Sequence, residues 1–142
     1  MRILGVDYGQ KRVGLAISDE TGTIAQSVDY VVGGSDRKVI EEVLRVAKDR
    51  AAGKIVVGVP VRMNGTPSPQ TGRTLQFVTT LKQSTPLPIE PWDERLTSVQ
   101  AERVLIEGNV RRKERKEKID KLAAQLMLQS YLDAINPPPV PE

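Results

Sequence analysis

The stretch Arg2–Asp19, with the sequence RILGVDYGQKRVGLAISD, contains two short apolar runs separated by a basic turn. The first run, Ile3–Val6, is too short for a helix, and the second, Val13–Ile17, follows directly after the polar residues 10–12. This pattern is typical of two β-strands joined by a tight turn. We therefore predict an N-terminal β-hairpin, around which the rest of the chain is arranged.

Asp7 is the first candidate site residue, because it lies where the first strand meets this turn. A carboxylate at the end of a nearly buried strand costs free energy unless something binds it. Gly5, Gly9 and Gly14 would let a backbone or a ligand come close to it. The alternative is that Asp7 only caps the turn, which is a common role for aspartate.

The composition excludes several kinds of catalytic site. The chain has 142 residues, which predicts one domain with an adequate core, and it contains neither cysteine nor histidine. Catalysis by a Ser-His-Asp or Cys-His arrangement is therefore excluded, and so are zinc sites built from Cys and His. Any bound metal needs oxygen ligands, which favours Mg²⁺ or Mn²⁺.

Nothing in the sequence indicates a membrane segment or a signal peptide. No segment approaches the ~20 apolar residues that a membrane span needs, and the chain begins directly with a strand-like pattern. Together with the lack of cysteine, this predicts a cytoplasmic protein without membrane contact.

The positive charge of the chain is concentrated in one place. Residues 111–118, RRKERKEK, carry six bases and two acids, whereas the net charge of the whole chain is only +3. The rest of the chain is therefore slightly acidic. A local basic run of this kind favours a polyanionic partner, although a solvated linker is an equally good interpretation.

The remaining elements alternate between strands and helices. Helical spacing of apolar residues predicts helices over Arg37–Ala52, which Gly53 would end, from Pro67 or Pro69 to Gln83, up to Glu107, and over Ile119–Ile135. Further strands are predicted over Ile24–Val32, over Lys54–Val59 and near residues 88–92. This order predicts an α/β fold with a mixed five-stranded sheet, an antiparallel meander followed by parallel strands, and helices on both faces. Residues 1–135 would form this single domain, and residues 136–142, with four prolines, a C-terminal tail.

Further candidate acids follow from this topology. In a crossover arrangement the carboxyl ends of parallel strands meet at one edge of the sheet, which would bring Asp93 and Glu94 to the same edge as Asp7. Glu94 could equally be a first-turn helix acid that the helix dipole favours. Asp120 shares a helix face with Ala123, Ala124 and Met127, which suits close packing against the sheet. Its alternative is again a helix N-terminal acid.

Three acids from three elements, without histidine, suit one chemistry. Carboxylates of this kind hold one or two divalent ions, which activate water and stabilise displacement at a phosphodiester. A polyanionic substrate would also explain the nearby bases as phosphate contacts that carry little sequence specificity. The candidate nucleic-acid contacts are Lys11, Arg12, Arg95, Arg111, Arg112, Lys113, Arg115 and Lys116.

Four motifs, in this order, resemble one known family. They are GVDYGQKRVGLAISD, VVGVP followed by NGT, DERLTS with Ala101 downstream, and IDKLAA. Together they are similar to the YqgF family of pre-16S rRNA nucleases, also described as Holliday junction resolvases, which has a ribonuclease H-like fold. The resemblance covers the chain from Arg2 to about Leu132. One departure is that DERLTS stands where Thr-Thr is frequent, but Ser98 keeps the hydroxyl group.

The resemblance implies a role for each acid. Asp7 would be the first metal ligand, one acid of the pair Asp93-Glu94 the second, and Asp120 the third, with Mg²⁺ or Mn²⁺ as the cofactor. We favour Glu94 over Asp93, because its longer side chain reaches back over the strand end. The resemblance further implies a cytoplasmic bacterial nuclease that trims the 5′ end of pre-16S rRNA, with ribosomal precursor particles as partners.

Three alternative functions remain open on the sequence. A Holliday junction resolvase would cut branched DNA with the same three acids, usually from two sites in a symmetric dimer, so that a monomer and a homodimer are both possible. DYGQKRVG also resembles the first phosphate loop of actin-like and sugar-kinase ATPases, but those need two such lobes. A non-catalytic nucleic-acid-binding module could use the basic run alone.

Overall fold

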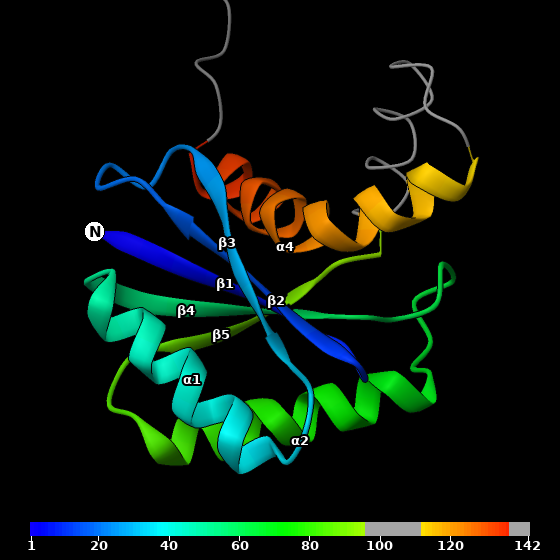
Figure 1. Ribbon diagram of the computed structural model, residues 1–142, viewed down its shortest axis with the longest axis horizontal. Helices are drawn as coiled ribbons and strands as arrows, with labels where there is room; N and C mark the ends of the chain where they lie inside the picture. The colour runs from blue at the N-terminus through cyan, green and yellow to red at the C-terminus, as the bar shows by residue number, and fades with distance from the viewer. Residues whose placement is uncertain (96–111, 137–142) are drawn as a thin grey trace, which may run out of the picture.

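In a computed structural model, the chain forms a five-stranded sheet with helices on both faces (Figure 1). The structure describes residues 1–95 and 112–136, and of Asp29 and residues 112–121 it describes only the backbone. The strands are β1 (Arg2–Tyr8), β2 (Arg12–Ser18), β3 (Ala25–Val32), β4 (Ala52–Val59) and β5 (Ile89–Asp93). The helices are α1 (Asp36–Asp49), α2 (Pro69–Ser84) and α4 (Arg112–Ile135). The predicted α/β fold is confirmed.

The strand order explains which residues meet at one edge of the sheet. The order is β3-β2-β1-β4-β5, with β1, β2 and β3 antiparallel and with β4 and β5 parallel to β1. Asp7 is in register with Gly58, and Val59 is in register with Asp93. The carboxyl ends of β1, β4 and β5 therefore lie together, as the predicted crossover topology requires.

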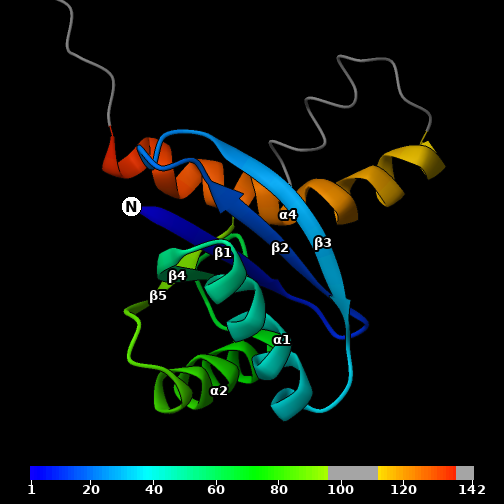
Figure 2. The same cartoon turned by 60° about the vertical axis from the view of Figure 1, so that its left-hand side comes forward.

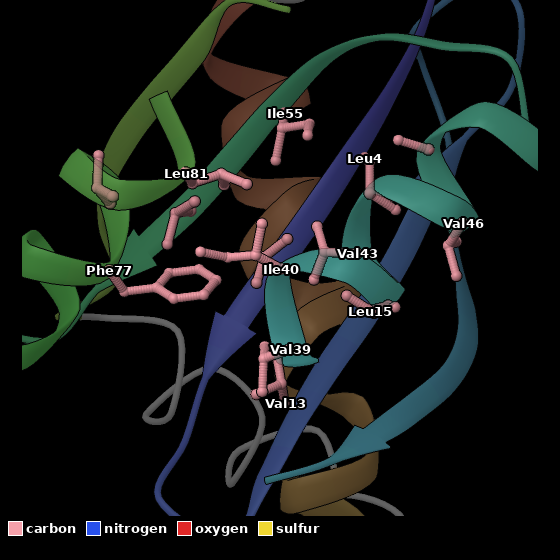
Figure 3. Close-up of a cluster of buried hydrophobic side chains, with 14 of the residues drawn as sticks. Leu4, Val13, Leu15, Val39, Ile40, Val43, Val46, Ile55, Phe77 and Leu81 are labelled. Carbon is pink, nitrogen blue, oxygen red and sulfur yellow. The ribbon is translucent and has the colours of Figure 1, made fainter. Parts of the chain in front are cut away.

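Two apolar clusters hold the layers together. Alternation along β1 sends Leu4 and Val6 toward α1 and α2, and Ile3 toward α4. The larger cluster joins the sheet to α1 and α2 through residues such as Phe77 and Leu81 (Figure 3). The smaller one joins α4 to the opposite face, and the turned view separates the three layers clearly (Figure 2).

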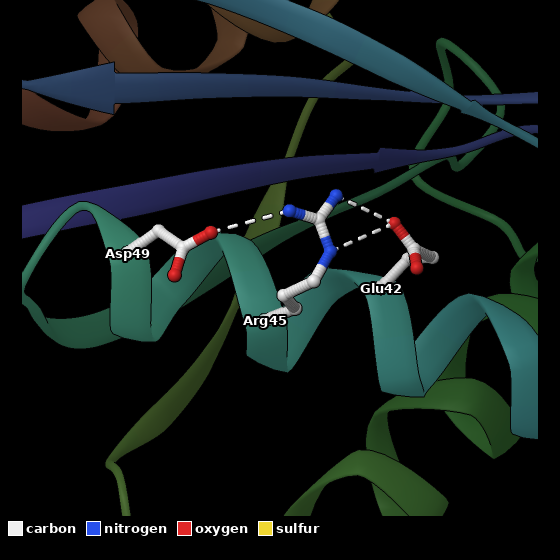
Figure 4. Close-up of polar contacts among 3 residues, drawn as sticks. All are labelled: Glu42, Arg45 and Asp49. Carbon is white, nitrogen blue, oxygen red and sulfur yellow. Dashed lines mark hydrogen bonds and ion pairs between the residues drawn. The ribbon is translucent and has the colours of Figure 1, made fainter.

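Helix α1 ends earlier than predicted. Ser35 caps its start by accepting a hydrogen bond from the backbone N–H of Lys38 at 3.3 Å. On its exposed face Arg45 pairs with Glu42 and Asp49 (Figure 4), contacts that contribute little to stability at such exposure. The prediction that Gly53 ends this helix is wrong.

The chain leaves α1 through Ala51, which adopts a left-handed conformation with φ of 55°. The next residue, Ala52, already pairs with Arg2 of β1, so that the turn must be completed before Gly53. Gly53 therefore lies in β4, where an added Cβ would lie 2.5 Å from the Met1 sulfur. Its role is close packing rather than helix termination.

Helix α4 begins seven residues earlier than the predicted start at Ile119. Arg112–Lys118, most of the basic run, forms its first turns, since Arg, Lys and Glu are all good helix formers. Asp120 consequently lies beyond the first turn of α4, and its interpretation as a helix N-terminal acid is wrong. At the other end Asn136 donates hydrogen bonds to the carbonyl oxygens of Gly22 (2.8 Å) and Leu132 (3.1 Å).

The helix predicted to end near Glu107 and tail residues 137–142 lie outside the described residues. None of the helices within the described residues is long and apolar enough to span a membrane.

Tyr131 ties α4 to β4 and β5. Its hydroxyl donates a hydrogen bond to Glu90 Oε2 at 2.6 Å and accepts one from Lys54 Nζ at 2.7 Å, while Lys54 and Glu90 form an ion pair at 2.6 Å. The hydrogen bond from Lys54, followed by that from Tyr131, lowers the pKa of Glu90 below its ordinary value of 4.5. Lys54 and Tyr131 therefore stabilise the charged form of Glu90 in the folded protein.

We expect Tyr131→Phe to lower the free energy of unfolding by about 1 kcal/mol at neutral pH, because one shared hydroxyl is lost while the ring remains. Since the pKa of Glu90 is lowered on folding, this stabilisation is present above 4.5 and is lost as the pH falls through the folded-state pKa. Denaturant unfolding of wild type and variant should show a difference that shrinks well below pH 4.5. A difference independent of pH would show that the hydroxyl acts without Glu90.

Candidate active site

Asp7 and Glu94 come together at the shared edge of β1, β4 and β5. Glu94 directly follows β5, and its backbone N–H donates a hydrogen bond to the carbonyl oxygen of Val59 at 3.2 Å. This bond fixes Glu94 over the end of β4, where its carboxyl group is hydrogen-bonded to Asp7. A Cβ added to Gly58 would overlap the Glu94 carboxyl group, so that the absence of a side chain at this position leaves the space that the carboxyl group fills.

The electrostatics of this pair disfavour two free negative charges. Burial raises the pKa of Glu94 well above its ordinary value of 4.5, and the nearby Asp7 carboxylate raises it further. The charged form of Glu94 is therefore costly in the protein alone. A proton or a cation shared by the two carboxyl groups would remove this cost.

Asp93 is engaged elsewhere. Its Oδ2 pairs with Arg95 Nε at 2.9 Å, and its Oδ1 accepts a hydrogen bond from the backbone N–H of Arg95, also at 2.9 Å. Of the two neighbouring acids, it is therefore Glu94 whose carboxyl group meets Asp7. This geometry agrees with the preference for Glu94 that its longer side chain suggested.

The position of Asp120 is known from the backbone of α4. It lies one helical turn before Ala124. A Cβ added to Gly14 of β2 would lie 3.2 Å from the Ala124 Cβ, so that α4 packs closely on β2 at this point. Ala124 and Met127 are buried against the sheet, so that position 120 belongs to the helix face that α4 turns toward β1 and β2. Its side chain lies outside the described part of the chain.

The described side chains alone do not complete a metal site. No group of three or more acidic side chains that could hold a metal ion occurs among them. The described part of the site is the pair Asp7–Glu94.

The loop after β4 passes close to Arg95, which follows Glu94 at the same edge. Asn64 Oδ1 accepts hydrogen bonds from the backbone N–H of Thr66 (3.1 Å) and from its hydroxyl (2.7 Å), and Gly65 has a φ of 85° that favours glycine. A Cβ on Gly65 would lie 3.1 Å from Arg95 Nη1. The NGT motif thus shapes a tight turn whose backbone passes close to the Arg95 guanidinium group.

A cavity of about 760 Å³ opens beside Asp7, between the β1–β2 turn, β3 and α4. Lys11 and Arg12, two of the predicted nucleic-acid contacts, line it together with Asp7. Tyr30, which no sequence pattern indicated, also lines the cavity, and its ring centroid lies 5.1 Å from the Arg12 guanidinium carbon. The side chains of the basic residues 111–116 lie outside the described part of the chain.

Comparison with known proteins identifies relatives over nearly the whole chain. The family model described as "RuvX: Holliday junction resolvase" matches residues 1–134. A protein of Thermoanaerobacter pseudethanolicus named "Putative pre-16S rRNA nuclease" is 49% identical over 135 residues, which cover 94% of this chain and 97% of the relative. A protein of the same name from Clostridioides difficile is 45% identical over 132 residues, 93% of this chain and 94% of the relative.

Solved structures show the same fold at low sequence identity. RuvC of Thermus thermophilus in complex with a Holliday junction substrate has a TM-score of 0.57 at 16% identity, covering 96% of each chain. The Holliday junction resolvase of fowlpox virus has a TM-score of 0.53 at 15% identity, covering 95% of this chain and 99% of the viral one. These matches confirm the ribonuclease H-like fold that the motifs implied. From the family match and the close relatives together, the chain belongs to the RuvX family.

Proposed function

We propose that this protein is a metal-dependent nuclease that hydrolyses phosphodiester bonds and processes the 5′ end of pre-16S rRNA in ribosome biogenesis. The observation that carries the proposal is the Asp7–Glu94 pair at the shared strand edge, beside a cavity lined by basic residues. Relatives at 49% and 45% identity that carry the name of this activity support the choice of substrate.

The donor set fits a hard divalent cation. Asp7, Glu94 and Asp120 would hold Mg²⁺ or Mn²⁺, since both ions prefer carboxylate oxygens and the chain offers neither His nor Cys. The raised pKa of Glu94 supports this assignment, because a cation would offset the cost of its charge. When bound, such an ion supplies an activated water and stabilises charge at the scissile phosphate.

The basic side chains would hold the substrate backbone. Lys11 and Arg12 line the cavity that also contains Asp7, and Arg95 lies at the same strand edge. The backbone of Arg112–Lys116 forms the start of α4, before Asp120 on the same helix. Phosphate contacts from these groups would supply affinity and position without sequence specificity. The expected partners are pre-rRNA and ribosomal precursor particles in the cytoplasm.

A second candidate is cleavage of branched DNA. Its support is the description of the family model and the fold shared with RuvC bound to a Holliday junction substrate. Paired cuts in a junction need two sites related by symmetry, so that this function would require a homodimer. The pre-rRNA function is compatible with a monomer.

The two candidates are separated by a cleavage assay on four substrates side by side: single-stranded RNA, a pre-16S 5′ leader, a four-way DNA junction and duplex DNA. Wild type, Asp7→Asn and a control, Asp49→Asn, would be compared with Mg²⁺ or Mn²⁺ and with a chelator. Asp49 is an exposed acid on α1, across the sheet from the cavity. We expect metal-dependent cutting of the RNA leader by wild type and the control, and none by Asp7→Asn.

Symmetric paired cuts in the junction would favour the resolvase instead. If no substrate is cut under any of these conditions, the nuclease proposal is wrong.

A further inference from the structure

We infer that the cavity beside Asp7 binds an unpaired nucleotide of the substrate strand, with the Tyr30 ring as the platform on which its base stacks. The inference rests on the proposed nuclease function and names the class of substrate: a strand with unpaired bases next to the cleaved phosphate.

The cavity has the size and the lining that a nucleotide needs. Its volume of about 760 Å³ lies within the range of ordinary small-ligand sites. Leu122 of α4 lines it as an apolar residue, together with the basic residues Lys11 and Arg12. A base needs an apolar, flat environment, and the phosphate attached to it needs the positive charge.

Tyr30 is not used to build the core. Of the five aromatic residues in the chain, four form two ring pairs. Tyr8 stacks on Phe77 with centroids 4.4 Å apart, and Trp92 meets Tyr131 edge-on at 5.2 Å. Tyr30 is instead 50% exposed, with Arg12 against its ring. An aromatic ring beside a cation is the arrangement that single-stranded nucleic acid binds through stacking and charge.

A bulge in β3 turns Tyr30 toward the side of Asp7. Val28 pairs with Leu15, but Val31 pairs with Val13, so that β3 contains one extra residue between these pairs. Strict alternation would put Tyr30 on the face of Val28, toward α1 and α2. Because the extra residue reverses the alternation, Tyr30 lies on the same side as Arg12 and Asp7.

The basic turn beside Tyr30 is held in place. The Gly33 N–H donates a hydrogen bond to the Lys11 carbonyl oxygen at 2.8 Å, and the Gly9 N–H donates one to the Arg12 carbonyl oxygen at 3.1 Å. A Cβ on Gly33 would lie only 2.7 Å from the Gln10 carbonyl oxygen, so that the chain after β3 packs tightly on the turn. This fixed backbone keeps the two basic side chains next to the ring, as a preformed site requires.

The site selects unpaired bases for a geometric reason. A base inside a duplex is stacked on both neighbours, so that its faces are not available to a protein ring. A single strand or a flipped base can offer one face to Tyr30 while its phosphate meets Lys11 and Arg12. We therefore expect Tyr30 to contribute to the binding of single strands and not of duplexes.

The test compares Tyr30→Ala, Tyr30→Phe and Val32→Ala with wild type. Val32 is the matched control, because it is an exposed apolar residue of the same strand, 73% exposed, that does not line the cavity. The probes are a fluorescently labelled single-stranded RNA and its fully paired duplex, titrated with a chelator present so that neither is cut. Melting temperatures check that each variant is folded.

We expect Tyr30→Ala to weaken single-strand binding about tenfold, which corresponds to the loss of one base–ring stack, and to change duplex binding less than about twofold. Tyr30→Phe and Val32→Ala should bind like wild type. Equal single-strand binding by Tyr30→Ala and Val32→Ala would overturn the inference and leave the nuclease proposal intact. If wild type binds neither probe, the inference and the proposed function both fail.

A second measurement begins with wild type, so that its first result does not depend on the folding of a variant. Single abasic sites are moved along the RNA, and binding to wild type is measured for each position. An abasic site at one position should lower the binding affinity about tenfold, and for Tyr30→Phe the affinity should fall at the same position. In Tyr30→Ala the abasic site at that position should not lower the binding affinity any further, since the substitution and the missing base remove the same contact. Equal affinity at every position would overturn the inference.

Discussion

Glu94→Gln is expected to reduce metal-dependent cleavage about 100-fold or more and at the same time to make the metal-free protein more stable. Loss of a group that only hydrogen-bonds to a metal ligand lowers metal affinity or activity 10- to 100-fold. Loss of a ligand itself should therefore lower activity by 100-fold or more. The stability gain follows from removing a carboxyl group whose ionised form is disfavoured by burial and by Asp7 in the folded protein, and we expect about 1 kcal/mol, or roughly 3 °C in melting temperature.

Asp93→Asn is the matched control for this prediction, because the two acids are neighbours in sequence. The Asp93 carboxylate forms an ion pair with the Arg95 side chain and accepts a hydrogen bond from the Arg95 backbone N–H. The amide oxygen of an asparagine at this position could keep the hydrogen bond to the backbone. Cleavage rates of this variant should stay within about threefold of wild type, as expected for an exposed ion pair of small energy. If Asp93→Asn is inactive and Glu94→Gln is active, the assignment of the two acids is reversed.

Gly58→Ala is expected to lower cleavage as strongly as the loss of an acid, although it removes no functional group. The added methyl group would overlap the Glu94 carboxyl group and would lie 2.9 Å from Met127 Cγ. Met127 can shift because its side chain is flexible, but a shift of the Glu94 carboxyl group would disturb its hydrogen bond with Asp7. The overpacking should also lower the free energy of unfolding by about 1 to 3 kcal/mol.

Gly53→Ala makes the same chemical change at the other end of β4. Its methyl group would meet only the side chain of Met1, which is exposed and can move away. We expect its cleavage rate to match wild type in the same assay. Equal rates for Gly58→Ala and wild type would show that the position of the Glu94 carboxyl group does not matter for the reaction.

The order of elements could be predicted from the sequence because it depends on local patterns. Continuous apolar runs mark β1 and β4, and helical spacing marks α1 and α2. The same patterns failed at two helix boundaries, for two different reasons. Helix α1 ends before Gly53 because Ala52 must pair with Arg2, and α4 begins at Arg112 because a charged run can form a helix as well as a linker.

The candidate site was predictable in part. The topology predicts that acids after parallel strands meet at one edge, and Asp7 and Glu94 do meet there. Which acid of the pair at 93–94 faces Asp7 depends on side-chain geometry and on the Arg95 contact, which a sequence pattern does not contain. Tyr30 was missed because a bulge in β3 decides on which face it lies, and the alternating pattern of that strand gives no sign of the extra residue.

The most direct test of the central claim, that Asp7 and Glu94 together bind a divalent ion, is a calorimetric titration with Mn²⁺ in the absence of substrate. We predict that wild type and Asp49→Asn bind Mn²⁺ with the same affinity, and that Asp7→Asn and Glu94→Gln each lose binding. Equal Mn²⁺ binding by wild type and by both site variants would contradict the claim.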